Sequence, residues 1–384
     1  MKKRFSLLLF FFLTALCSKL EAVTLSPDAR ISVLTCAPGS ELYSLFGHSA
    51  VRVEDPAQNI DLVFNYGTFD FNTPHFYLKY AQGLLPYQLS ITSYQNFISS
   101  YIEDNRSVYS QLLKLNPSER QKLFDLLWEN HQPANRTYLY NFLFDNCSTR
   151  VRDIIAKSTN QPIRWEMPNT GKSFWNLLDE YLYRLPWIKW GIHTILGQSG
   201  SRQATPYQYM FLPDYLLKGL DAATVGDHRL TDPALTLFRA EEPLLSHPWY
   251  FSPCFVFSAA VLLLIFLLQK YRSKKLLIGL SALLFTATGL IGLLLIFLSF
   301  FTKHPMTSPN LNLIWANPLN LIVLGFLARK HFPFFIRGYL NLYLFLLLLG
   351  IPVWFFASPA VPLASLPLLI LMAYLCVKLK RIKS

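Results

Sequence analysis

Apolar residues gather in one short run near the start of the chain and in five long runs in its last third. The long runs cover residues 250–269, 276–301, 311–328, 338–357 and 361–377. A helix needs about 20 apolar residues to cross a bilayer, and most of these runs reach that length. The pattern therefore predicts an all-α domain of five transmembrane helices over residues 249–384.

The region before these runs, residues 23–248, has the mixed pattern of a folded domain exposed to water. Short β-rich runs between turn residues predict strands at 31–36, 48–54, 61–66 and 107–115. Asn116, Pro117 and Glu119 together form a helix-start signal. Further helices are expected after Asn146, near 172–183 and near 207–220. These elements predict one α+β domain.

The first 22 residues have the form of an export signal. A positively charged start at residues 2–4 precedes an apolar run at 5–16, and Ala22 is the expected last residue before cleavage. Lipid attachment at Cys17 would need a small residue before it, and Leu16 is not small. A retained anchor helix would be short for a membrane span. We therefore expect a cleaved signal peptide and an exported domain after it.

Basic residues are distributed unevenly over the expected loops. The first and third loops and the C-terminal tail carry eleven Lys and Arg, whereas the second and fourth loops carry only Lys303. The positive-inside rule then places the C-terminus in the cytoplasm and residues 23–248 outside. The net charge of +12 arises from this asymmetry, because residues 23–248 hold 19 basic and 22 acidic side chains. We therefore expect no nucleic-acid partner.

The stretch 302–320 combines four Asn and three Pro at the third apolar run. Asparagine is costly in lipid unless it faces protein, water or a substrate. Two interpretations stay open. These residues form loops and interhelical hydrogen bonds, or they line a polar path beside the exported domain, with His304 at its outer end.

Cys147 stands at the expected start of the helix after Asn146. The helix dipole and the free amide groups at that position favour a thiolate, and Arg150 and Arg152 add positive potential. A disulfide with Cys36 is the alternative in an oxidising compartment. We favour a nucleophilic thiol.

A thiolate nucleophile needs a base, and His48 is the candidate. It opens an expected strand directly after Gly47, whose small size permits close approach. Considered alone, one strand histidine is more often structural than catalytic. The sequence has no metal-ligand spacing, Gly-rich phosphate loop or dinucleotide fingerprint, so we expect neither a metal nor a cofactor.

Together these residues carry a resemblance to known proteins. A Gly-His-Ser strand followed about 100 residues later by an Asn-Cys helix start is similar to the circularly permuted NlpC/papain-like fold of thiol enzymes. Longer motifs resemble the bacterial lipoprotein N-acyltransferase family Lnb. They are ELYSLFGHSA at 41–50, FNYGTFDF at 64–71, NR at 105–106, FLFDNCSTR at 142–150 and the stretch 304–320.

The resemblance implies an acyltransferase with Cys–His catalysis. Cys147 would take a fatty acyl chain from a membrane phospholipid as a thioester, with His48 as general base. The chain would then pass to the α-amine of a lipoprotein that begins with diacylglyceryl-cysteine. Asn65 would orient His48, with Asp61 and Asp70 competing for that role.

The resemblance also implies substrate contacts by Tyr43, Asn146, Arg150 and His304. It places the chain in the bacterial inner membrane, with the catalytic domain in the periplasm. Two other functions stay open: a membrane-tethered cysteine hydrolase of peptidoglycan peptides, and a non-enzymatic exported binding domain with a Cys36–Cys147 disulfide. A hydrolase needs only one anchor helix, so five apolar helices favour the acyltransferase.

Overall fold

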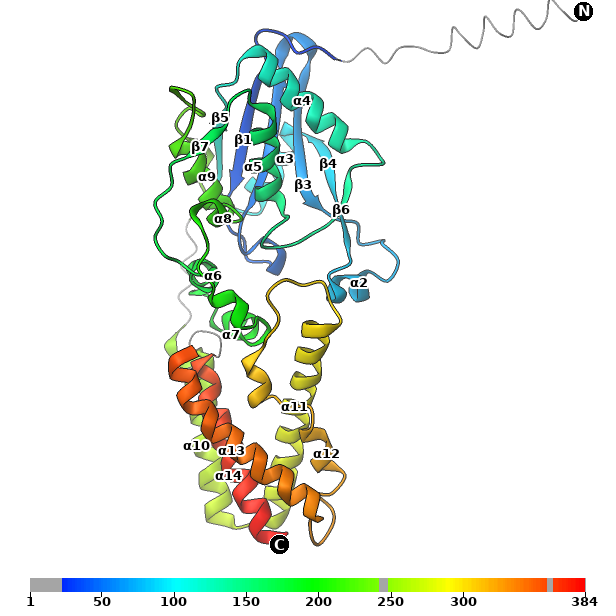
Figure 1. The fold of residues 1–384 in the computed structure, drawn as a ribbon, viewed down its shortest axis with the longest axis vertical. Helices are drawn as coiled ribbons and strands as arrows, with labels where there is room; N and C mark the ends of the chain where they lie inside the picture. The colour runs from blue at the N-terminus through cyan, green and yellow to red at the C-terminus, as the bar shows by residue number, and fades with distance from the viewer. Residues whose placement is uncertain (1–22, 242–247, 358–361, 384) are drawn as a thin grey trace, which may run out of the picture.

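The computed structural model describes residues 23–241, 248–357 and 362–383, so the expected signal peptide lies outside the described residues. A sheet-containing part and a helical part stand one above the other along the long axis of the molecule (Figure 1). The chain forms the sheet-containing part first and then enters the helical part.

The main sheet has seven antiparallel strands in the spatial order β10-β5-β1-β2-β3-β4-β6. They are β1 (Arg30–Cys36), β2 (His48–Asp55), β3 (Ile60–Thr68), β4 (Pro86–Ser93), β5 (Val108–Leu112), β6 (Thr137–Leu139) and β10 (Leu235–Phe238). Cys36 at the end of β1 lies opposite His48 at the start of β2. The four runs expected from the sequence become β1, β2, β3 and β5, whereas β4, β6 and β10 were not expected.

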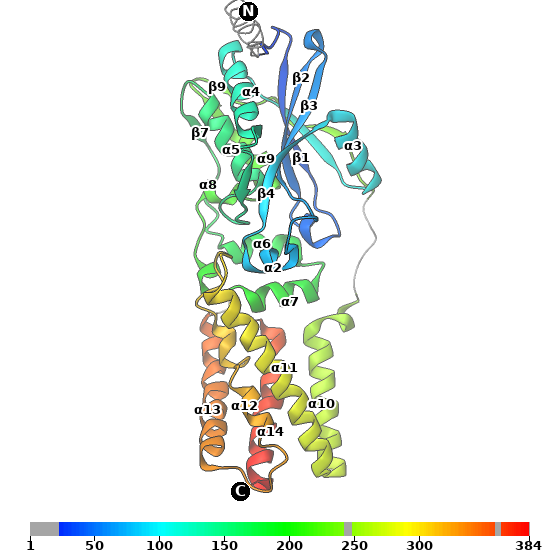
Figure 2. The ribbon, with the colours of Figure 1, turned by 90° about the vertical axis from the view of Figure 1, so that its right-hand side faces the viewer.

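Both faces of the sheet are covered by helices. Helices α4 (Pro117–His131) and α5 (Cys147–Ser158) lie on one side and α3 (Tyr94–Glu103) lies on the other, as Figure 2 shows with the sheet nearly edge-on. Val33 of β1 belongs to the core under α4 and α5, and its neighbour Leu34 belongs to the core under α3. Successive strand residues point to opposite faces, so β1 contributes to both cores.

Smaller elements lie beside the main sheet or between it and the helical part (Figure 1). They are α2 (Phe76–Gln82), α6 (Phe174–Leu182), α7 (Pro186–Ile195), α8 (Pro206–Tyr209), α9 (Pro213–Ala222) and a three-stranded sheet of β7 (Ile163–Trp165), β8 (Ala223–Val225) and β9 (His228–Arg229). The stretch near 207–220, which was expected to be helical, is divided between α8 and α9. Pro213 lacks the N–H that a continuous helix needs there, and it opens α9 instead.

Four helices of the described chain are long and apolar enough to cross a membrane. They are α10 (Pro253–Tyr271), α11 (Lys274–Phe300), α13 (Phe334–Ala357) and α14 (Leu366–Ile382). They match the first, second, fourth and fifth apolar runs of the sequence. The structure therefore does not support the expectation of five continuous helices.

The third apolar run is a broken segment. It forms a 3₁₀ turn (Leu311–Ile314) and the short helix α12 (Asn320–Leu324). Pro318 interrupts the helical hydrogen bonds, and Asn317 Oδ1 accepts the Leu319 N–H instead (3.0 Å). The buried Asn320 side chain donates to Thr288 Oγ1 on α11 (2.8 Å). Partners on a neighbouring helix thus satisfy the polar groups of this segment.

The broken segment still joins the two ends of the helical part. On its N-terminal side, the Lys303 N–H donates to Gln82 O of α2 (2.8 Å), close to the sheet-containing part. On its C-terminal side, Lys383 Nζ donates to Arg329 O (2.6 Å), at the end where the chain terminates. The basic junctions α10–α11 and α12–α13 and the C-terminus all lie at the end farthest from the sheet (Figures 1 and 2).

Candidate functional site

Cys147 is the first residue of α5 and is 7% exposed. Asn146 caps this helix by accepting the Thr149 N–H (2.9 Å), and the Thr149 hydroxyl accepts the Asn146 N–H (2.8 Å). This reciprocal capping fixes the first turn. The thiol therefore lies at the positive end of a well-anchored helix.

His48 and Asn65 stand on the neighbouring strands β2 and β3. His48 Nε2 lies 3.2 Å from Asn65 Oδ1. A carbonyl oxygen can only accept, so Nε2 carries the proton and donates it. In the neutral ring this leaves Nδ1 without a proton, as a general base requires.

The thiol of Cys147 and the ring of His48 interact, and each changes the pKa of the other. Burial raises the pKa of the thiol, but the charge and hydrogen bond of His48 outweigh it and hold the pKa below its ordinary value. The backbone N–H of Ser49 and the hydroxyl of Ser148 act in the same direction. Burial lowers the pKa of His48, but the Cys147 thiolate and the bonds to Cys147 and Asn65 raise it. The pair therefore favours thiolate and imidazolium.

These shifts predict how alkylation of Cys147 by iodoacetamide depends on pH. The reactive thiolate forms as pH rises through the lowered pKa. The pH at which alkylation reaches half of its maximal rate should therefore be lower than for a free cysteine. In His48→Ala this midpoint should move to higher pH, because burial then raises the pKa of Cys147 without the charge of His48 to lower it. The measurement uses a chain in which the other cysteines are serine. An unchanged midpoint in His48→Ala would contradict the pairing.

Glycine and aromatic residues shape the space beside the thiol. A Cβ added to Gly67 would lie 3.7 Å from Cys147 Cβ, 3.4 Å from the Tyr140 ring and 3.9 Å from the Tyr138 hydroxyl. Gly67 also has φ of +88°, which favours glycine. The Tyr138 hydroxyl is buried and has no hydrogen-bond partner within the described part of the chain. No local signal in the sequence marks Tyr138 and Tyr140, because their place beside the thiol depends on the pairing of β6 with β4.

Gly47 fixes the position of His48. Its φ is +81°, and a Cβ there would lie 2.6 Å from the carbonyl oxygen of Cys36. The sequence motif Gly-His therefore has a structural reason, because β2 can approach β1 this closely only without a side chain at position 47.

Cys36 is a free thiol, as is Cys147, so the structure does not contain the disulfide of the alternative hypothesis. Burial raises the pKa of Cys36 to about 12. Of these two exported cysteines, only Cys147 has surroundings that stabilise a thiolate.

Asp61 and Asp70, the alternatives to Asn65 for orienting His48, have other hydrogen-bond partners. Asp61 accepts from Arg52 Nε (2.7 Å) in an exposed contact between β3 and β2, and Asp70 accepts the Asn72 N–H (2.8 Å) within a turn. Asn65 is the residue of these three that contacts the His48 ring.

The structure does not bring all the expected substrate-contact residues to the thiol. The two N–H groups of the Asn146 amide bond to Phe142 O and Phe211 O, so this side chain positions the helix rather than a substrate. Arg150 forms a bidentate ion pair with Asp145 (2.6 and 2.8 Å).

Arg150 also covers the ring of Tyr138, with its guanidinium carbon 3.4 Å from the ring centre. Tyr43 is exposed and carries no hydrogen bond among the contacts described.

His304 likewise lies away from Cys147. Its Nε2 donates to Tyr80 O and Ala81 O of α2 (3.1 Å each), so it joins the helical part to α2. Asn310 and Asn312 donate to backbone oxygens of α7, including Thr194 O. These contacts favour the first of the two interpretations, in which the polar residues form loops and hydrogen bonds, and through them the Asn-rich stretch holds the two parts of the molecule together.

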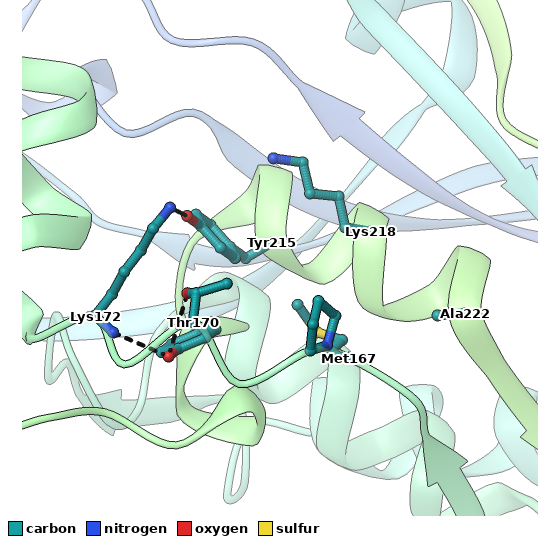
Figure 3. Close-up of a pocket in the computed structure, with 8 residues that line it drawn as sticks. Met167, Thr170, Lys172, Tyr215, Lys218 and Ala222 are labelled. Carbon is teal, nitrogen blue, oxygen red and sulfur yellow. Dashed lines mark hydrogen bonds between the residues drawn. The ribbon is translucent and has the colours of Figure 1, made fainter.

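A surface cavity of about 220 Å³ lies near α9, away from the thiol. It is lined by Met167, Pro168, Thr170, Lys172, Tyr209, Tyr215, Lys218 and Ala222 (Figure 3). Lys172 Nζ already donates to the Tyr215 hydroxyl (2.8 Å) and pairs with Glu180. Within the described residues, no group of three or more His, Cys, Asp or Glu side chains could hold a metal ion.

Two family models match the chain and show the protein family to which it belongs. Residues 20–176 match the family model described as the Lnb N-terminal periplasmic domain, and residues 246–383 match the Lnb transmembrane domain. The chain belongs to the Lnb family. No match was found among curated proteins or solved structures. The resemblance found in the sequence is thus confirmed, and this Lnb protein is a membrane protein with a periplasmic domain.

Proposed function

We propose that this Lnb protein is a lipoprotein N-acyltransferase that works through a thioester on Cys147. One observation carries the proposal. A thiol at a helix N-terminus is paired with a histidine that an amide orients, and this group belongs to a domain fixed directly onto the outer ends of membrane-spanning helices.

In the first step, the Cys147 thiolate attacks the ester carbonyl of a phospholipid. A C–S bond forms and the C–O bond to glycerol breaks. The imidazolium of His48 gives its proton to the leaving alkoxide, so a lysophospholipid departs and Cys147 carries the acyl chain. Asn65 keeps the His48 ring in the required tautomer and orientation.

The transition state carries negative charge on the former carbonyl oxygen, and hydrogen-bond donors must face it. The backbone N–H of Ser49, which helps to lower the pKa of the thiol, and the free N–H groups at the start of α5 are the backbone donors near the sulfur. The unpartnered Tyr138 hydroxyl is a further donor in the same place.

In the second step, the neutral α-amine of the acceptor attacks the thioester. His48 takes the amine proton, a C–N bond forms, the C–S bond breaks, and the thiolate–imidazolium pair is restored. An α-amine has a pKa of about 8, so a useful fraction is neutral near pH 7. The acceptor we propose is the N-terminal diacylglyceryl-cysteine of a lipoprotein, which is held in the same membrane as the donor.

The proposal includes the architecture around this chemistry. We infer a circularly permuted NlpC/papain-like arrangement for residues 23–248, because the histidine strand precedes the cysteine helix in the chain. The basic residues at the end farthest from the sheet favour a cytoplasmic C-terminus in the bacterial inner membrane.

An assay of transfer tests the function. Full-length protein in phospholipid vesicles should convert a diacylated lipopeptide with a free amine into a triacylated product with an amide-linked chain. The matched control is the same lipopeptide with an acetylated amine, which should stay unchanged. Release of free fatty acid without amide formation, or cleavage of peptidoglycan peptides instead, would contradict the proposal and favour a hydrolase.

A further inference from the structure

Five aromatic residues make a chain of ring contacts between α2 and the thiol. We call Phe71, Phe76, Phe69, Tyr87 and Tyr140 the aromatic row. The ring centres lie 5.0 Å apart for Phe71–Phe76, 5.7 Å for Phe76–Phe69, 5.2 Å for Phe69–Tyr87 and 4.4 Å for Tyr87–Tyr140. The candidate chemistry described above does not use this row.

The inner end of the aromatic row lies beside Cys147. The Tyr140 ring and Cys147 Cβ approach the same point over Gly67, at 3.4 and 3.7 Å from a Cβ built there. Because Gly67 has no side chain, position 67 of β3 places no side chain between this ring and Cys147. The row therefore ends where an acyl group would be attached.

The outer end of the aromatic row is exposed, close to the helical part. Phe71 is 68% exposed, and Tyr77 on α2 is 82% exposed. Both views place α2 between the lower edge of the sheet and the outer end of α11 (Figures 1 and 2). The bonds from Lys303 and His304 to α2 confirm this position.

Other exposed aromatic residues mark the same boundary on the opposite side of the helical part. Trp249 and Tyr250 lie just before α10, at its outer end. Tryptophan and tyrosine collect at the interface between lipid and water, so these positions indicate the depth at which α2 meets the bilayer.

We propose that the aromatic row binds the acyl chain of a membrane phospholipid and guides it from the bilayer surface to Cys147. The proposal deepens the proposed function and rests on it. Water does not stabilise an acyl chain that leaves the bilayer, whereas a series of aromatic rings in contact gives it apolar surface along the path. The row begins at lipid depth and ends at the thiol, which favours a lipid chain over any soluble ligand.

Two acyl donors, a long-chain phospholipid and a water-soluble ester, distinguish a failure of this inference from a failure of the proposed function. Full-length Phe71→Ser should load Cys147 from a long-chain phospholipid at least tenfold more slowly than the unmodified protein, and should load from water-soluble p-nitrophenyl butyrate at the same rate. Trp249→Ala, which removes an equally exposed aromatic residue off the row, should leave both rates unchanged. Equal rates from phospholipid in Phe71→Ser and the unmodified protein would overturn the inference. Failure of the unmodified protein to load from phospholipid would instead overturn the proposed function.

A second measurement needs no catalysis. Full-length Cys147→Ala in vesicles of a phospholipid with a photoreactive acyl chain should crosslink at residues 69–87 and at Tyr140, outside the membrane spans. Tyr87→Ala should lose the crosslink at Tyr140 and keep the crosslinks near α2. Crosslinks confined to α10, α11, α13 and α14 would contradict the inference even if the protein transfers acyl chains.

Discussion

Replacing Cys147 with alanine should abolish acyl transfer to a diacylated lipopeptide and leave the protein folded. The expected loss is on the order of 10⁴-fold or more, as for removal of a covalent nucleophile that acts as a unit with its base. The substitution removes one sulfur atom at the start of α5, while the capping by Asn146 and Thr149 remains. Transfer rates and circular dichroism of the purified variant check this result.

Two companion variants make this prediction specific. His48→Ala should also lose most of the transfer activity, since the thiol would lack both its base and the charge that lowers its pKa. Cys36→Ser should keep most of the activity, because Cys36 is buried and its raised pKa makes it a poor nucleophile. Transfer by Cys147→Ala at an appreciable rate would show that the thiol is structural.

Asn312→Ala should destabilise the connection between the periplasmic and helical parts. The Asn312 amide donates to His193 O (3.3 Å) and Thr194 O (3.2 Å) of α7 and accepts from Trp315 Nε1 (2.9 Å). All of these contacts are buried, so the variant leaves the indole N–H and a carbonyl of α7 unpaired. The expected cost is about 2–4 kcal/mol of the free energy of unfolding.

Thermal unfolding in detergent measures this effect, and Asn317→Ala is the matched control. Asn317 lies in the same segment but makes one local bond, to the Leu319 N–H, so its loss should cost much less. Asn312→Ala should also slow acyl loading from phospholipid more than alkylation of Cys147 by iodoacetamide, because only loading needs the thiol held over the bilayer. Equal stability of the two variants would contradict the role of Asn312.

The sequence indicates the elements that carry the thiol and the histidine because both have local signals. Asn146, directly before Cys147, is a residue type that caps helices. In the structure its side-chain oxygen accepts the Thr149 N–H, as the cap requires. The β-rich runs between turn residues indicate β1, β2 and β3. The contact between His48 and Asn65 joins two strands, so no local signal marks it. Counting along the strand pair indicates Asn65 but does not exclude Asp61 and Asp70.

The remaining features depend on partners that are distant in sequence. Strand β10 has four residues at the sheet edge, and its pairing with β5 is interrupted between Thr236 and Phe238, so no periodic pattern reveals it. The third apolar run is long enough for a helix, yet Pro318 and the bonds of Asn320 to α11 favour a broken segment. Hydropathy counts apolar residues and cannot detect such a break.

The most direct test of the thioester mechanism is to incubate full-length protein with phospholipid alone and identify any adduct by mass spectrometry. The account predicts one fatty acyl group on the peptide that contains Cys147, released by hydroxylamine at neutral pH and cleared when a diacylated lipopeptide with a free amine is added. His48→Ala should not form the adduct. Transfer to the lipopeptide without any adduct, or an adduct on another residue while Cys147→Ala stays active, would contradict the account.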